Sequence, residues 1–230
     1  MNNKRVRLYY WLFLLIGSFI LGVLSAQYQW GKLIKYSIFA VWMIFLMGLM
    51  VAINLSWYKK ISEELMNMSR ILVEEGNVEH FLEENNRLLK DKKAKQFQSI
   101  HKINHAVACC YEDEFDIAEE WLEQVEPKSL IPSGRAVYIA DLVWVKMNLG
   151  KMEEALAIFH EQEKLLSDMS KLDETLDTLI KMMEVKECIF SKEFDKAKII
   201  FEEVKKREIP YNEKDIRKLE RELDEAISLK

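Results

Sequence analysis

Two long apolar runs without a charged residue dominate the N-terminal quarter of the chain. The first covers residues 8–31 and the second covers residues 36–58. An α-helix needs about 20 apolar residues to cross the hydrocarbon core of a bilayer, and both runs reach that length. Tyrosine and tryptophan lie at the ends of the runs, at the level where aromatic side chains meet lipid headgroups. The pattern therefore predicts a transmembrane helical hairpin over residues 1–58, with spans at about 8–28 and 36–58.

The rest of the chain has the periodicity of amphipathic helices, and one pattern recurs. An aromatic residue or methionine is followed three positions later by alanine, and four positions after that by a large apolar residue. The pattern occurs in residues 114–125, 151–162 and 193–204, where the alanines are Ala118, Ala155 and Ala197. An apolar-periodic segment precedes each copy, around residues 97–111, 135–149 and 172–190. The pattern predicts three helix pairs over residues 94–206.

This pattern resembles the tetratricopeptide repeat (TPR), a helix–turn–helix unit of about 34 residues with alanine and phenylalanine four positions apart in its second helix. The matching residues are Ala118/Leu122, Ala155/Phe159 and Ala197/Phe201. The family's turn glycine is present as Gly150, whereas Asp113 and Lys192 occupy that place in the other two turns. The resemblance covers residues 60–206. It implies an α-solenoid of stacked helix pairs whose concave groove binds a protein or peptide.

Two flanking segments extend the predicted stack. Residues 59–93 are expected to form a linking, degenerate helix pair, in which Phe81 replaces the alanine of the repeats. Residues 207–230 are expected to form a C-terminal capping helix, because Pro210 ends the preceding helix. The apolar stripe of that helix consists of Ile216, Leu219, Leu223 and Ile227. The predicted fold class is therefore all-α: a transmembrane helical hairpin, a TPR-like α-solenoid and a capping helix.

Composition supports long helices and a reducing compartment. The chain has only three prolines and seven glycines among 230 residues, so it contains few turns. Its three cysteines are Cys109, Cys110 and Cys188. Their number is odd and two are adjacent, so they do not form a disulfide framework.

The distribution of charge predicts the orientation in the membrane. Lys4, Arg5 and Arg7 precede the first apolar run and Lys59 and Lys60 follow the second, whereas the connecting loop holds Lys32 and Lys35. The positive-inside rule therefore predicts a multi-pass protein of the cytoplasmic membrane with both termini and the helical domain in the cytoplasm. A cleaved signal peptide is disfavoured, because the first run is longer than a signal peptide's apolar region.

Charge also argues against nucleic acid as a partner. Residues 1–60 hold seven of the 33 basic residues and no acidic one. Residues 61–230 therefore hold 26 basic residues against all 38 acidic ones, a balance of −12. Binding to nucleic acid depends on neutralising phosphates with lysine and arginine, which this domain does not favour.

No catalytic motif is recognisable, so we expect no enzymatic activity, cofactor or metal. The chain has no P-loop, dinucleotide-binding glycine motif, nucleophile elbow or HExxH sequence. His101, His105 and Cys109 share one helix face, and these residue types can bind zinc. Three ligands in successive turns span about 11 Å along the helix, too far for one tetrahedral ion, so packing is the favoured interpretation.

The two apolar runs contain small residues at helical spacing. They are Ser18, Gly22 and Ala26 in the first run, and Ala40, Gly48 and Ala52 in the second. Small faces allow membrane helices to approach closely. Either the hairpin packs on itself through them, which we favour, or it docks onto another membrane protein.

The first helices of the repeats supply the expected binding surface. The residues predicted to line the partner-binding groove are Ile103, Val107, Tyr111, Val137, Trp144, Met147, Met182, Lys186 and Phe190. Such an apolar groove would suit an amphipathic helix, unless the superhelix closes it or the terminal helix fills it. The favoured function is a membrane-anchored scaffold that binds a protein or peptide partner at the lipid bilayer. The alternative is a structural accessory subunit of a larger membrane complex, bound through the hairpin.

Overall fold

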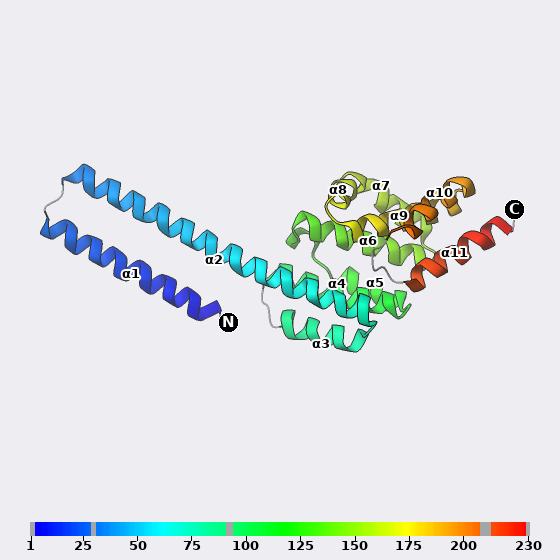
Figure 1. The fold of residues 1–230 in the computed structure, drawn as a ribbon, viewed down its shortest axis with the longest axis horizontal. Helices are drawn as coiled ribbons and strands as arrows, with labels where there is room; N and C mark the ends of the chain where they lie inside the picture. The colour runs from blue at the N-terminus through cyan, green and yellow to red at the C-terminus, as the bar shows by residue number, and fades with distance from the viewer. Residues whose placement is uncertain (1–2, 29–30, 91–93, 208–212, 229–230) are drawn as a thin grey trace. The chain divides into compact units, whose positions relative to one another are not determined.

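The computed structural model describes residues 3–28, 31–90, 94–207 and 213–228, and all regular structure in these ranges is helical (Figure 1). The prediction of an all-α chain is confirmed. The chain divides into two compact units, Met1–Leu65 and Met66–Lys230. Helix α2 (Lys32–Glu75) runs unbroken from the first unit into the second. The two units are described separately below.

The N-terminal unit is an antiparallel pair formed by α1 (Asn3–Gln27) and the first part of α2. The Nε1–H group of Trp42 donates to the Oγ atom of Ser18 over 3.3 Å, and the Tyr10 hydroxyl donates to the Leu46 carbonyl oxygen over 3.3 Å. The indole of Trp42 also lies directly against Gly17, where a Cβ atom would collide with it. Both helices are long and apolar enough to cross a membrane.

Most of the small residues singled out in the apolar runs lie on the surface of this pair. Among the described residues, Gly22 and Gly48 have no neighbouring atom where a Cβ would stand. Ala26, Ala40 and Ala52 are also exposed. The hairpin therefore packs on itself through Gly17, Ser18 and the Trp42 ring, and leaves the other small residues exposed.

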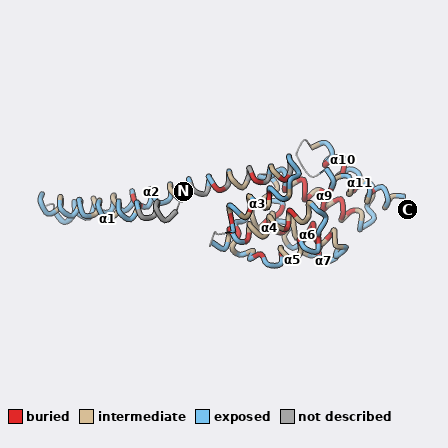
Figure 2. The backbone as a smooth tube through the Cα atoms, turned by 90° about the horizontal axis from the view of Figure 1, so that it is seen from below, coloured by how far each residue is buried: buried red, intermediate tan, exposed pale blue. Residues whose placement is uncertain are grey.

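The second unit consists of the end of α2 followed by nine further α-helices in its described residues. They are α3 (Val78–Leu89), α4 (Lys95–Tyr111), α5 (Phe115–Glu123), α6 (Pro132–Asn148), α7 (Met152–Glu161), α8 (Glu163–Ser170), α9 (Glu174–Phe190), α10 (Phe194–Lys205) and α11 (Glu213–Ser228), with a short 3₁₀ turn at Pro127–Ser129. Helix α4 packs on α5, α6 on α7 and α9 on α10, and α6 contacts both α4 and α9. Figure 2 shows buried positions along these helices and mostly exposed ones along α1.

The recurring alanines lie inside the packed helix pairs. Ala118, Ala155 and Ala197 have no exposed surface. A larger side chain at these positions would push the second helix of each pair away from the first. The large apolar residues one turn later are also buried, namely Leu122, Phe159 and Phe201. One sequence pattern thus builds the same contact in each of the three pairs.

The turns between paired helices share one backbone conformation. Gly76, Gly150, Asp113 and Lys192 all have a left-handed φ, between 60° and 75°. Glycine adopts this conformation without cost, whereas a residue with a Cβ atom is strained there. Asp113 and Lys192 therefore carry a backbone cost at positions where a glycine would fit.

Helix α8 is an element that the sequence pattern did not predict. It lies between the second and third pairs, and its Leu166 is buried in the common core. Its insertion explains why Ala155 and Ala197 are separated by 42 positions, compared with 37 between Ala118 and Ala155. It also separates α7 from α9 and so shapes the cleft described below.

Candidate functional site

Most of the residues predicted to line the groove are covered by the chain itself. Ile103, Trp144, Met147, Met182 and Lys186 are buried, and Val107, Tyr111 and Val137 are half-buried. The apolar members of the buried set share a core with Leu219 and Leu223 of α11. Phe190 alone among the predicted residues is mainly exposed, with 51% of its surface accessible. Contact of these residues with a partner stays a prediction. A partner could reach the buried ones only if the elements that cover them moved away.

Helix α11 lies over a surface that runs from the α4–α5 turn to α9. We call this surface, which α11 covers, the inner groove. At the first turns of α11, Lys214 pairs with Asp113 and donates to the carbonyl oxygen of Tyr111, while the Lys218 ammonium lies 4.6 Å from the centre of the Phe115 ring. Two turns later, Glu222 of α11 accepts a hydrogen bond from Lys186 of α9 over 2.6 Å. Leu219 and Leu223 lie between these contacts and are almost fully buried. The terminal helix therefore occupies the place expected for a ligand.

Lys186 is a buried cation held from two sides. Its ammonium lies 2.6 Å from the Glu222 carboxylate and 5.3 Å from the centre of the Trp144 ring. Only 6% of Lys186 is exposed, and this burial lowers its pKa although Glu222 acts in the opposite direction. Helix α11 thus supplies the countercharge for a lysine of the inner groove.

Two buried carboxyl groups are further features of this region. Burial raises the pKa of Asp141, on α6, to about 7, and its Oδ2 atom is inaccessible to solvent and has no hydrogen-bond partner among the described residues. Burial, reinforced by Asp113, raises the pKa of Asp215, on α11, to about 6 despite the opposing lysines Lys218, Lys214 and Lys186. The pKa of the Cys110 thiol is raised by burial and by the charges of Asp141, Asp215 and Asp113. The inner groove therefore brings together three acidic side chains from different elements around one thiol.

Sequence reasoning missed both of these carboxyl groups. A signal for Asp141 was present, since it is the only acidic residue of α6 and lies among apolar neighbours. Asp215 gave no such signal, because it lies in a helix rich in charged residues. Its burial follows from the orientation that α11 takes on the other helices.

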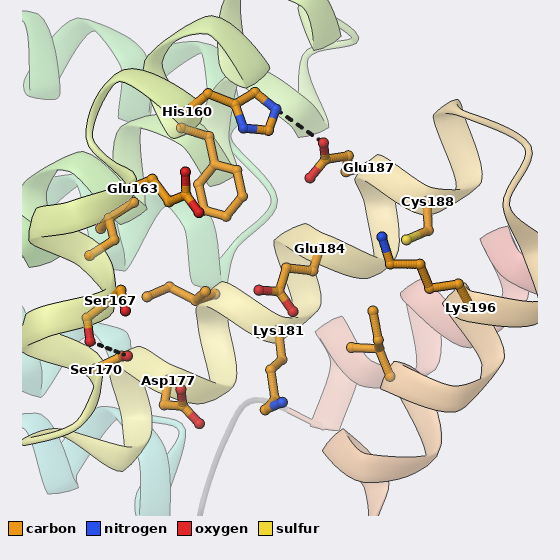
Figure 3. Close-up of a pocket in the computed structure, with 14 residues that line it drawn as sticks. His160, Glu163, Ser167, Ser170, Asp177, Lys181, Glu184, Glu187, Cys188 and Lys196 are labelled. Atoms are coloured by element: carbon orange, nitrogen blue, oxygen red, sulfur yellow. Dashed lines mark hydrogen bonds and ion pairs between the residues drawn. The ribbon is translucent and has the colours of Figure 1, made fainter.

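A second concave region lies between α7 and α8 on one side and α9 and α10 on the other (Figure 3). Its volume is about 520 Å³, with an apolar base that includes Phe159, Leu166 and Ile180. His160 at its rim pairs with Glu187 over 3.0 Å. Burial raises the pKa of Glu184, whose carboxylate points into the cleft. This cleft was not predicted, because it depends on α8.

His101, His105 and Cys109 have packing roles in the structure. The Nε2 atom of His101 lies 2.9 Å from the Asn86 Oδ1 atom, and the His105 ring stacks on Trp121 at 4.4 Å between centres. Burial lowers the pKa of both histidines, which keeps them neutral near pH 7. In the described ranges, no group of three or more histidine, cysteine or acidic residues is arranged to hold a metal ion. Cys109, Cys110 and Cys188 are free thiols.

Comparison with known proteins gave no match to a family model, to a curated protein or to a solved structure. Function must therefore be inferred from the residues and geometry of this chain.

Proposed function

We propose that this protein is a membrane-anchored, non-catalytic scaffold whose TPR-like helix pairs bind a helical segment of a protein partner. The observation that carries the proposal is the position of α11, an amphipathic helix that buries Leu219 and Leu223 and forms ion pairs with Asp113 and Lys186. A surface that accepts this helix has the shape and chemistry to accept another.

The hairpin supports a membrane location for the scaffold. Its two helices are long enough and apolar enough to span a bilayer, and their side chains face mainly outward. The lysine and arginine counts of the short flanking segments favour a cytoplasmic helical domain. Attachment to the membrane would raise the effective concentration of the domain for partners in the same membrane.

A non-catalytic role agrees with the state of the ionisable groups in the inner groove. Lys186 is paired with Glu222, and both Asp215 and the Oδ2 atom of Asp141 are buried. A substrate does not reach these groups while α11 is seated. A general acid or base must come within hydrogen-bond distance of its substrate, which this arrangement prevents.

The second candidate function is a structural subunit that joins a larger membrane complex through its hairpin. The exposed small residues Gly22, Gly48 and Ala52 favour this alternative, because they leave room for another membrane helix to approach.

Affinity capture from native membranes separates the two functions. The tagged full-length chain is solubilised in a mild detergent and its partners are identified by mass spectrometry. A second chain carries an unrelated transmembrane hairpin in place of residues 1–58. A partner retained by both chains supports the scaffold, whereas a partner lost with the native hairpin supports the subunit. Capture of no specific partner by either chain contradicts both.

A further inference from the structure

The contacts of α11 are those of a ligand more than those of a core helix. Its apolar residues Leu219 and Leu223 are buried, but its ion pairs with Asp113 and with Lys205 of α10 lie largely at the surface. The Lys205–Glu220 pair, for example, joins side chains that are 40% and 44% exposed. Exposed pairs of this kind contribute little to stability, so the attachment of α11 depends on a short apolar contact and on the Lys186–Glu222 pair.

One residue on the buried face of α11 opposes its own seating. Asp215 is only 8% exposed, and burial and the negative charge of Asp113 together outweigh the attraction of Lys218, Lys214 and Lys186. Its carboxylate loses hydration when α11 docks, and its pKa of about 6 records that cost. An uncharged side chain at this position would fit the inner groove better.

The space beside α11 is also incompletely filled. A depression of about 380 Å³ remains along the helix. Its lining is entirely charged and consists of Asp113, Lys214, Lys218, Arg221, Glu222 and Glu225. The depression lies at the surface, so this side of α11 contacts charged side chains and solvent instead of a packed core.

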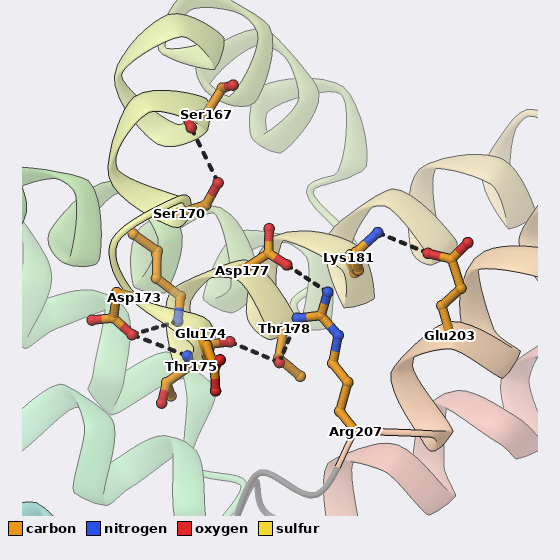
Figure 4. Close-up of polar contacts among 11 residues, drawn as sticks. Ser167, Ser170, Asp173, Glu174, Thr175, Asp177, Thr178, Lys181, Glu203 and Arg207 are labelled. Atoms are coloured by element: carbon orange, nitrogen blue, oxygen red, sulfur yellow. Dashed lines mark hydrogen bonds and ion pairs between the residues drawn. The ribbon is translucent and has the colours of Figure 1, made fainter.

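The chain is anchored at Arg207, ahead of residues 208–212 and α11, and this anchor would keep α11 close to the groove if it were displaced. Arg207 follows α10 and donates to the Asp177 carboxylate and, over 3.0 Å, to the Thr178 hydroxyl of α9 (Figure 4). Residues 208–212 then connect this anchor to α11. A short connection of this kind gives an effective concentration in the millimolar range, which a competing ligand must overcome.

We propose that α11 is a displaceable internal ligand of the inner groove, and that the helix that replaces it belongs to a partner protein and carries an uncharged residue where α11 carries Asp215. The replacing helix is amphipathic, with apolar residues at the places of Leu219 and Leu223. This inference rests on the proposed function. It adds the chemistry of the partner's helix, and it states that α11 occupies the inner groove while no partner is bound.

The test uses the full-length chain in detergent at pH 7.5 and fluorescein-labelled synthetic peptides with the sequence of residues 213–228. The peptide has the native sequence, Asp215→Asn, or the control change Asp224→Asn at an exposed position. Binding is measured by fluorescence anisotropy to the native chain and to a chain with Leu219→Ala and Leu223→Ala. Because its own α11 competes less well, the variant chain is expected to bind the native peptide at least tenfold more tightly.

The peptides then report the chemistry of the partner. The Asp215→Asn peptide is expected to bind about tenfold more tightly than the native peptide, because it avoids burying a carboxylate. The Asp224→Asn peptide is expected to match the native peptide within twofold. Equal binding of all three peptides would overturn the assignment of Asp215 as the residue that weakens the internal ligand.

Two further measurements keep the proposal falsifiable if the double alanine variant does not fold. A chain with Lys214→Glu and Lys218→Glu loses the contacts of α11 to Asp113, Tyr111 and Phe115 but keeps Leu219 and Leu223, and it is expected to bind the Asp215→Asn peptide more tightly than the native chain does. Hydrogen exchange of the native chain is expected to be faster in α11 than in α9. Exchange of α11 and α9 at one common rate would identify α11 as a fixed cap and overturn the proposal.

The competing occupant is α11 of a second copy of this chain. Dimers of the variant chains in detergent, with peptide unable to dissociate them, would overturn the assignment to a partner protein. Failure of displacement is distinct from failure of the proposed function. If no peptide displaces α11 but the chain still captures a partner from membranes, that partner binds outside the inner groove.

Discussion

Helix α9 carries two lysine–glutamate ion pairs that face different surroundings. Lys181 lines the cleft between α7–α8 and α9–α10, which we call the outer cleft. It pairs with Glu203 of α10 over 2.9 Å, and 24% and 55% of the two side chains are exposed (Figure 4). Lys186, five positions further along, pairs with Glu222 of α11 in the inner groove, where 6% and 35% are exposed. Both pairs join a lysine ammonium to a glutamate carboxylate at a similar distance, and they differ mainly in how far they are buried.

The difference teaches that burial decides how much an ion pair matters. Water screens the pair in the outer cleft, so that loss of either partner leaves a hydrated charge. In the inner groove, loss of Glu222 leaves the Lys186 ammonium without a countercharge in a poorly hydrated site. The inner groove therefore behaves as an interior that α11 completes, whereas the outer cleft behaves as a surface. Four pairs of substitutions test this distinction, from the largest expected effect to the smallest.

Trp144→Ala tests whether the inner groove is an interior. Trp144 is only 4% exposed and lies in the common core, so removal of its ring is expected to lower the free energy of unfolding by about 3–5 kcal/mol. Phe190→Ala, at the exposed end of α9, is expected to change it by about 0.5 kcal/mol or less. Chemical denaturation followed by circular dichroism gives both values, and equal losses would contradict the distinction.

Asp141→Asn tests the buried carboxyl group through its pH dependence. Because the pKa of Asp141 is raised from 3.8 to about 7 by folding, its contribution to stability is fully present below pH 4, is lost as the pH rises to 7, and is constant above that. The native chain is expected to lose about 4 kcal/mol over this interval through Asp141, and the variant to lose correspondingly less. The unfolding free energy at pH 4, 6 and 8 reports the slope.

The control for this slope is Asp224→Asn, which changes an exposed carboxylate of α11. It is expected to leave the pH dependence unaltered. Asp215 retains a slope of the same sign in all three chains, because its pKa is also raised. An unchanged slope in Asp141→Asn would show that this group ionises normally in the folded protein.

Glu222→Ala and Glu203→Ala compare the two ion pairs directly. Loss of Glu222 is expected to lower the free energy of unfolding by about 1–2 kcal/mol, because Lys186 stays buried without its partner. Loss of Glu203 is expected to give no measurable change, since Lys181 gains water in its place. Thermal unfolding of the two variants under the same conditions checks the order, and the reverse order would refute the assignment of the surroundings.

Lys192→Gly and Asp113→Gly compare two turns of the same left-handed conformation. Glycine at position 192 relieves the backbone strain and is expected to raise the free energy of unfolding by about 0.5 kcal/mol. Glycine at position 113 relieves the same strain but loses the contacts of Asp113 with Lys214 and Lys218 of α11. It is therefore expected to stabilise less, and the difference between the two melting temperatures measures the contribution of Asp113 to holding α11.

The helix pairs were predictable because their determinants are local. The spacing of Ala118, Ala155 and Ala197 places one small residue on the packing face of each second helix, and all three are buried as a close helix contact requires. The place of the turn residue was equally readable, since Gly150, Asp113 and Lys192 share one left-handed conformation. Helix α8 was not predicted, because eight residues carry too short a periodic pattern to stand out.

The sequence by itself determined the all-helical class, the apolar N-terminal helices and the register of the three helix pairs, because helical periodicity and turn chemistry act over a few neighbouring residues. Only the tertiary structure decided that Trp144 and Met182 lie in a core, that Asp141 and Asp215 are buried, and that α11 occupies the inner groove. These outcomes depend on contacts between residues far apart in the chain, such as Lys214 with Asp113 and Lys186 with Glu222. The orientation of α11 about its own axis, which sets Asp215 inside and Asp224 outside, follows from packing against helices that the local pattern does not contain.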